Sequence, residues 1–119
     1  FYTRASGLSV DCRADWPEQV VRIYQAQREL HLPSGLLVTV PVPEEAELSP
    51  QIMEKAIRLA LENAEAQGIQ GKALTPHLLS RVASATGGAS LRANLALLEN
   101  NARVAARIAC ALAMDAHAA

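Results

Sequence analysis

The sequence has few aromatic residues, and all of them stand in its first quarter. They number four among 119 residues: Phe1, Tyr2, Trp16 and Tyr24. The remaining three quarters must therefore build a core from Leu, Ile, Val and Ala, whose side chains bury less surface than aromatic rings. We expect a thin core.

Cysteine is scarce, and neither an excess of one charge nor a long hydrophobic run is present. Cys12 and Cys110 lack a Cys-x-x-Cys partner, which excludes a disulfide framework or a typical zinc site and favours an intracellular, by default cytoplasmic, location. The 11 basic and 12 acidic residues give a net charge of −1, so we expect no nucleic-acid and no anionic-membrane partner. No run reaches the roughly 18 apolar residues of a membrane span, which indicates a soluble protein.

The hydrophobic content of 50% is high enough for a folded domain. The strongest strand pattern is "GLLVTV", residues 35–40, and a short extended stretch is expected around residues 8–12. Because "GLLVTV" has no polar alternation, it should be buried on both faces in a sheet covered by helices. Two strands cannot form such a sheet alone, and the chain begins with Phe1 and no signal-peptide pattern. The partner strands are therefore either missing from this chain or supplied by another one, and we expect residues 1–119 to be a piece of something longer that does not fold independently.

Helix-start and helix-stop signals predict four helices. Their N-caps are Asp15, Ser49, Thr75 and Ser90, and the first three helices end at the "HLPSG" stretch, at Gly68, and at Gly87 and Gly88. The order of strands and helices predicts an α/β fold, with helices dominating the C-terminal half.

Two adjacent asparagines, Asn100 and Asn101, stand within the last predicted helix, where Asn is unfavourable by roughly half a kcal/mol relative to Ala. A helical projection places the charged residues Arg92, Glu99, Arg103 and Arg107 on one side. It places an apolar face opposite, formed by Leu91, Leu98, Ala105, Ile108 and Leu112. Asn94 and Asn101 fall near the middle of this predicted inner face, and Asn100 falls nearer its boundary.

A carboxamide among leucines needs hydrogen-bond partners, because leaving it unpaired would cost roughly 1–3 kcal/mol. Neighbouring backbone groups could supply them, and structural satisfaction is the commoner case for a buried amide. Alternatively, an amide offers both donors and an acceptor without charge, which suits a sugar hydroxyl or the edge of a pyrimidine. Both interpretations of Asn94 and Asn101 stay open on the sequence.

A second candidate site lies in "GIQGKALTPHLL". Free amides at the start of the predicted helix favour an anion, to which Lys72 could add charge and Thr75 and His77 further polar contacts. The alternative is an ordinary Thr75 cap followed by Pro76, with Lys72 in solvent.

No self-sufficient catalytic motif such as G-x-S-x-G or H-E-x-x-H occurs in the chain. Four blocks in order, however, resemble the C-terminal third of pseudouridine-5'-phosphate glycosidases, a family that includes the indigoidine synthase A-like proteins. The blocks are "FYTRASG", "PVPEE", "GIQGKALTPHLL" and "TGGASLRANLALLENNARVAA".

The resemblance implies an α/β/α enzyme, assembled as a homotrimer, that reversibly cleaves pseudouridine 5'-phosphate to uracil and ribose 5-phosphate. It implies a lysine that opens the ribose and forms an imine at C1', which lets uracil leave. A divalent metal, manganese in this family, assists. The lysine, its acidic partner and the metal ligands belong to the upstream two thirds, so we expect no metal ligand in this chain and no catalysis by it alone.

The site residue that carries over is an Asn of the "NNAR" block, which matches Asn100 or Asn101, and the predicted helical phase selects Asn101. Asn94, Lys72, Thr75 and His77 are further candidates for substrate binding. The sequence departs from the family where Val40 precedes "PVPEE" and where Ala5 replaces a common Ser. The other hypothesis for this chain is a non-catalytic helical segment used for interaction or assembly.

Overall fold

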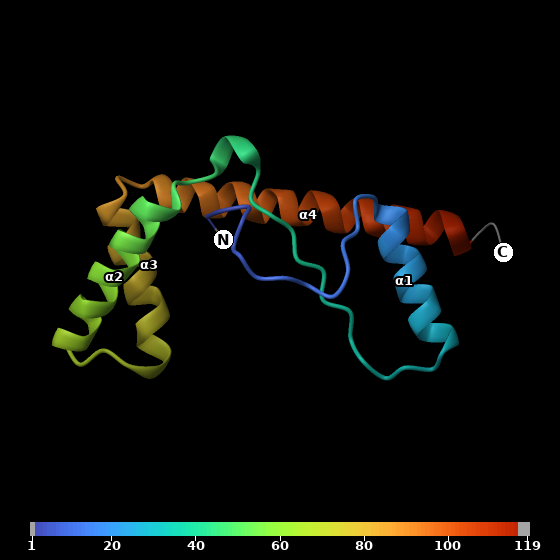
Figure 1. Ribbon diagram of the computed structural model, residues 1–119, viewed down its shortest axis with the longest axis horizontal. Helices are drawn as coiled ribbons and strands as arrows, with labels where there is room; N and C mark the ends of the chain where they lie inside the picture. Colours follow the sequence, from blue (N-terminus) through green and yellow to red (C-terminus); the bar gives the residue numbers. More distant parts are fainter. Residues whose placement is uncertain (1, 117–119) are drawn as a thin grey trace. The chain divides into compact units, whose positions relative to one another are not determined.

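The computed structural model describes residues 2–116, and every regular element in that range is helical (Figure 1). The elements are α1 (Pro17–Glu29), the 3₁₀ turn η1 (Glu44–Ala46), α2 (Pro50–Ala66), the 3₁₀ turn η2 (Gly71–Ala73), α3 (Leu74–Ala85) and α4 (Ala89–Ala116). They form two compact units, of which the first comprises residues 2–6 and 41–98 and the second residues 7–40 and 99–116. No helix in the described range is both long and apolar enough to cross a membrane.

The predicted α/β fold is wrong for the described residues, because none of residues 2–116 lies in a strand. The "GLLVTV" segment, Gly35–Val40, and the stretch at residues 8–12 are irregular chain. A strand is stabilised by the hydrogen-bond ladder of a neighbouring strand, and neither segment has one in this part of the chain. Leu37 is accordingly 86% exposed rather than buried on both faces.

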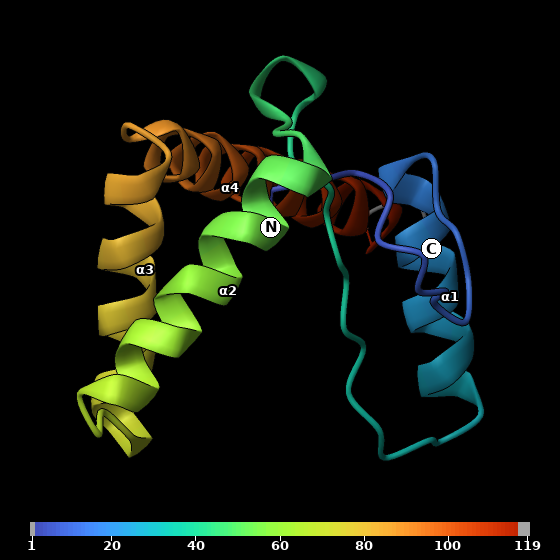
Figure 2. The ribbon, with the colours of Figure 1, turned by 60° about the vertical axis from the view of Figure 1, so that its left-hand side comes forward.

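The first unit has its core in a hairpin of α2 and α3, which lie side by side in both views (Figure 2). The apolar stripe of α2 supplies the buried residues Met53, Ala56 and Ala60, and Val82 of α3 packs against them. Helix α2 begins after Ser49 with Pro50 in its first turn, and it ends before Gly68, whose φ of 64° favours glycine. The predicted start of this helix after Ser49 and its predicted end at Gly68 are confirmed.

Helix α3 begins at Leu74, so the prediction that Thr75 is its N-cap is wrong. The preceding 3₁₀ turn continues directly into the helix, and Pro76 is tolerated in the first turn because its missing N–H would have had no partner there. At the other end Thr86 closes the corner to α4. Its hydroxyl donates to the Val82 carbonyl (2.8 Å), and its oxygen accepts from the Ser90 amide (3.2 Å). Ser90 therefore lies buried just inside α4.

Four long-range hydrogen bonds, which we call the clasp, join the "FYTRASG" block to residues 42–48, within and just after "PVPEE". Two of them share the acceptor Glu47 Oε1, to which the Thr3 hydroxyl (2.9 Å) and the Arg4 amide (2.7 Å) donate. Arg4 Nη1 donates to the Val42 carbonyl (3.0 Å), and the Leu48 amide donates to the Tyr2 carbonyl (2.8 Å). Phe1, the first residue of the block, lies outside the described residues.

Glu47 should make the clasp sensitive to acid. The hydrogen bond from the Arg4 amide, then that from the Thr3 hydroxyl, and the nearby Arg4 guanidinium hold the pKa of Glu47 below its ordinary value of 4.5. A carboxyl group whose pKa is lowered on folding stabilises the fold above its unfolded pKa, and this stabilisation is lost as pH falls through the folded pKa. We expect the protection of the Arg4 amide in hydrogen-exchange NMR to fall as pH drops below 4.5.

The variant Glu47→Gln keeps an acceptor oxygen but cannot titrate, so its Arg4 protection should not change over that pH range. Glu45→Gln, at an exposed position of η1, is the matched control and should behave like the unmodified protein. Equal pH dependence in the Glu47→Gln variant would show that another group governs the clasp.

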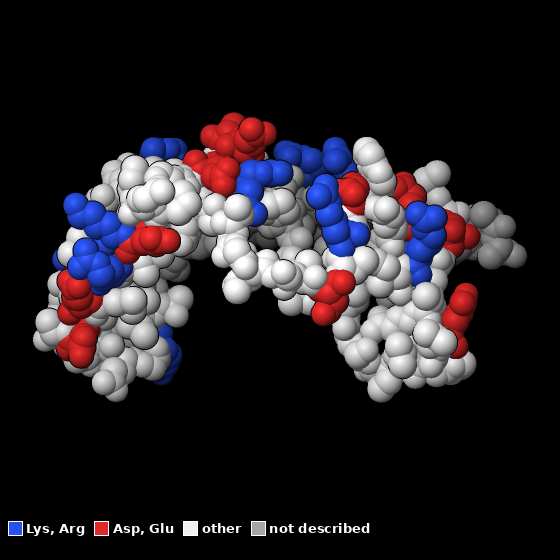
Figure 3. Space-filling view, viewed as in Figure 1, with Lys and Arg blue, Asp and Glu red and all other residues white. Residues whose placement is uncertain are grey.

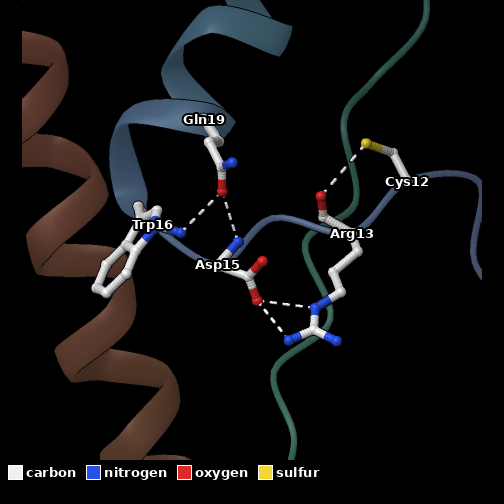
Figure 4. A network of polar contacts seen from close by, with 5 residues as sticks. All are labelled: Cys12, Arg13, Asp15, Trp16 and Gln19. Carbon is white, nitrogen blue, oxygen red and sulfur yellow. Dashed lines mark hydrogen bonds and ion pairs between the residues drawn. The ribbon is translucent and has the colours of Figure 1, made fainter.

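The second unit contains α1 and the C-terminal part of α4, and a polar network starts α1 (Figure 4). Asp15 was predicted to be the N-cap, but the N-cap is Trp16 with Pro17 at the first helical position. The Gln19 side chain reaches back and accepts from the amides of Asp15 (2.6 Å) and Trp16 (3.0 Å). The Asp15 carboxylate instead pairs with Arg13 at 2.6 Å. A glutamine three residues into the helix thus replaces the predicted aspartate cap.

Candidate functional site

The three candidate amides of α4 differ in exposure. Asn94 and Asn100 are half-buried, whereas Asn101 is exposed. Part of the predicted inner face is likewise exposed in this chain: Leu91 and Leu98 are each 54% exposed, whereas Ile108 is half-buried. The predicted helical phase of α4 therefore matches the burial seen in the structure only in part.

The residues of α4 that this chain does cover lie on a different arc of the helix. They include the buried or half-buried residues Ser90, Ala93, Leu97, Asn100, Val104, Ile108 and Ala111. Their spacing of three and four residues defines one continuous face. Asn94 and Asn101 lie at the border between this covered face and the exposed leucines. Helix α4 thus carries two apolar arcs, and these two amides stand where the arcs meet.

The residues of the second candidate site lie at the tip of the α2–α3 hairpin. Lys72 in η2 and Thr75 in the first turn of α3 are exposed, and no side chain caps this helix. His77 is half-buried, and its Nε2 lies 3.0 Å from Oδ1 of Asn63 on α2. The same oxygen accepts from Gln67 Nε2 at 2.8 Å. The His77 ring is therefore engaged in holding the two helices together.

The two candidate sites of the first unit lie at opposite ends of α3. Lys72 and Thr75 stand at its start, and α4 with Asn94 begins beyond its last turn (Figure 2). A helix of 12 residues is about 18 Å long. The structure does not bring these residues into one cluster.

The contact between His77 and Asn63 gives a stability prediction. We expect the substitutions His77→Ala and Asn63→Ala each to lower the free energy of unfolding, with a coupling of roughly 0.5–1.5 kcal/mol between them in a double-mutant cycle. Denaturant unfolding measures it, and Lys72→Ala at the exposed tip is the control. Strictly additive effects of the two substitutions would mean that the hydrogen bond contributes nothing to the hairpin.

The second unit has an apolar groove of about 390 Å³ that the sequence interpretation missed. Its walls are α1, the irregular segment after it and α4, with Val21, Tyr24, Leu36, Ile108 and Leu112 among the lining residues. Gln27 closes one part of the wall, because its Nε2 donates to the carbonyl (2.9 Å) and hydroxyl (2.8 Å) of Ser34. The signal in the sequence was the stripe of apolar residues along α1 followed by "GLLVTV". None of the candidate amides lines the groove.

Charged groups give no cation site within residues 2–116. No three or more His, Cys, Asp or Glu side chains are grouped there so as to hold a metal ion. Acidic and basic side chains are interspersed on the face seen in Figure 3. Glu44 and Glu45 of η1 are both exposed. The prediction that any metal ligands lie upstream stays a prediction.

The chain matches the family model of the indigoidine synthase A-like proteins over residues 1–111. It is 52% identical over 113 residues to a pseudouridine-5'-phosphate glycosidase from Rhodospirillum centenum, and this alignment covers 95% of this chain and 35% of that protein. It is 44% identical over 119 residues to the glycosidase of the same name from Cupriavidus pinatubonensis, and this alignment covers 100% of this chain and 38% of that protein.

Two solved structures share the fold of this chain over almost its whole length. A prealnumycin C-glycosynthase, solved in complex with ribulose 5-phosphate, superimposes with a TM-score of 0.84 at 33% identity over 98% of this chain and 39% of that one. An indigoidine synthase A-like protein from Thermotoga maritima gives a TM-score of 0.76 at 38% identity over 96% of this chain and 36% of that one. The chain thus spans little more than a third of the length of these relatives. It belongs to the indigoidine synthase A-like family.

Proposed function

We propose that the protein containing this chain reversibly cleaves the C–C glycosidic bond of pseudouridine 5'-phosphate to give uracil and ribose 5-phosphate. The observation that carries this proposal is the identity of 52%, over 95% of the chain, to a glycosidase of that name. In this proposal the chain is the C-terminal helical third of the enzyme, and the remaining part of the same protein is its first partner.

The chemistry explains why a helical third would be insufficient. A C-glycoside has no heteroatom leaving group, so protonation alone does not release the base. When the C–C bond breaks, its electron pair would leave with uracil, which takes up a proton at C5, and the nitrogen of a lysine bound at C1' of the opened ribose would supply the electron pair that turns C1' into an imine. We place that lysine upstream, as the family resemblance implies.

We propose that α4 contributes a side-chain carboxamide that hydrogen-bonds the substrate. A carboxamide both donates and accepts hydrogen bonds, which fits the alternating edge of uracil or a ribose hydroxyl. Asn101 is the first candidate, and Asn100 and Asn94 follow. Their support is the meeting of two apolar arcs at Asn94 and Asn101, because a partner that covered the exposed leucines would also exclude water from these amides and strengthen their hydrogen bonds.

For the phosphate, Lys72 and the first turn of α3 with Thr75 are the contacts we propose within this chain. The amides of that turn have no side-chain cap, and a helix N-terminus favours an anion. His77 is proposed only as a neighbour of this site, because its ring is held by Asn63. We assign the divalent metal, manganese in this proposal, to the upstream part, and the assembly to a homotrimer.

The test uses the complete parent protein, which includes the upstream part. Incubation with pseudouridine 5'-phosphate should release uracil, followed by chromatography, and uracil with ribose 5-phosphate should give back the nucleotide. Absence of both reactions from a folded parent protein would refute the proposal. Such a result would favour the assembly hypothesis, which is supported by the exposure of large apolar side chains such as Leu37 (86%) and Met114 (75%).

A further inference from the structure

Helix α4 carries an exposed stripe of leucines in the first unit. Leu91, Leu95 and Leu98 follow one another at spacings of four and three residues, so they lie along one side of the helix. They are 54%, 51% and 54% exposed. The opposite side is already occupied, because Ser90 is 4% and Ala93 1% exposed. We call Leu91, Leu95 and Leu98 the leucine stripe.

A stripe of this kind is costly to leave in water. Covering each half-exposed leucine would contribute about 1 kcal/mol, because burying a whole side chain contributes roughly 1.5–3 kcal/mol. A helix that is apolar on two sides is typical of one packed between two layers. The first unit supplies one layer of side chains, and the described residues supply no second one for these leucines.

We infer that the leucine stripe is the surface on which the upstream part of the same protein docks. Two observations favour this occupant over a second copy of the chain. The relatives are more than twice as long as this chain, which covers 35% and 38% of two of them, so a large body of protein is available in the same molecule. Asn94 stands between Leu91 and Leu98 on the stripe's edge, and in the proposed function the amides of α4 must meet a substrate held by an upstream lysine. The inference rests on the proposed function in this second respect only.

Cysteine labelling in the complete parent protein tests the surface without disrupting it. Cys12 and Cys110 are both exposed and are first replaced by Ser. Single substitutions Leu91→Cys and Leu98→Cys probe the stripe, and Arg92→Cys, which is exposed and points to the charged side of α4, is the matched control. We expect the stripe positions to react with a maleimide about tenfold or more slowly than the control in the native protein, and equally fast after denaturation.

Labelling of the stripe positions as fast as the control would overturn the inference. Slow labelling that becomes fast when sedimentation shows the oligomer dissociating on dilution would also overturn it, because a second copy would then be the occupant. Slow labelling in the dissociated protein supports it. Uracil release is measured on the same preparations, so protected leucines in a protein without this activity would retain the docking surface while refuting the proposed function.

Discussion

The 119-residue chain alone is expected to release no uracil from pseudouridine 5'-phosphate, whereas the same chain joined to its upstream two thirds is expected to release it. The expected difference is a complete loss, because the lysine that would stabilise C1' as an imine during C–C cleavage is missing and the amides of α4 cannot replace it. Oriented hydrogen bonds can stabilise a leaving uracil anion, but they cannot supply the electron pair that the electron-deficient C1' of the sugar needs.

The two lysines of the chain do not fill this role. Lys55 and Lys72 are both exposed. An imine-forming lysine is activated by removal from water or by another cation beside it. Lys55 lies on the outer side of α2, and Lys72 lies in the 3₁₀ turn at the hairpin tip.

The measurement is uracil release by equal concentrations of the chain and the parent protein, each with and without added manganese. Lys55→Ala and Lys72→Ala in the parent protein are the controls. Neither should abolish turnover, and only Lys72→Ala should raise KM if this lysine contacts the phosphate. Sustained turnover by the short chain, lost in either lysine variant, would show that the imine-forming lysine had been assigned to the wrong part of the protein.

Helix positions were predictable from the sequence because their signals are local. Pro17 and Pro50 in first turns, Gly68 after α2 and the glycine pair before α4 limit the backbone within a few residues, whatever lies around them. The caps at Asp15, Thr75 and Ser90 were each misplaced by one or two residues. For Asp15 and Thr75 another local group, Gln19 or the 3₁₀ turn η2, provides the start of the helix. Helix α4 begins at Ala89, so Ser90 lies inside it.

The strand and the phase of α4 were not predictable because both depend on neighbours. "GLLVTV" has the composition of a buried strand, but its backbone has no ladder to join in this chain. For α4, a projection separates charged from apolar residues, but it cannot say which of two apolar arcs the chain itself covers. Ser90 and Ala93 are buried on one of these arcs. Thr86, in the corner before α4, forms a hydrogen bond with the Ser90 hydroxyl there, and a projection of a single helix does not contain such a contact.

The two asparagines should separate catalysis from stability in the parent enzyme. Asn101→Ala is expected to lower kcat/KM by roughly 30- to 1000-fold, which corresponds to the loss of one directed hydrogen bond, about 2–4 kcal/mol, in the transition state. Asn100→Ala is expected to lower it less. The reason is their placement: Asn101 borders the exposed leucines, whereas Asn100 lies on the face that this chain already covers.

Melting temperature distinguishes the two roles. Asn100 is half-buried in this chain, so Asn100→Ala should reduce the free energy of unfolding by about 1 kcal/mol, while Asn101→Ala should leave the melting temperature near that of the unmodified enzyme. The variant Asn101→Asp keeps the size of the side chain but loses its donors, so it should be as slow as Asn101→Ala if the amide donates to the substrate. A larger loss of turnover in Asn100→Ala, with unchanged melting, would place the substrate on the covered face of α4 instead. The leucine stripe could then still contact the upstream part, but Asn101 would have no part in the reaction.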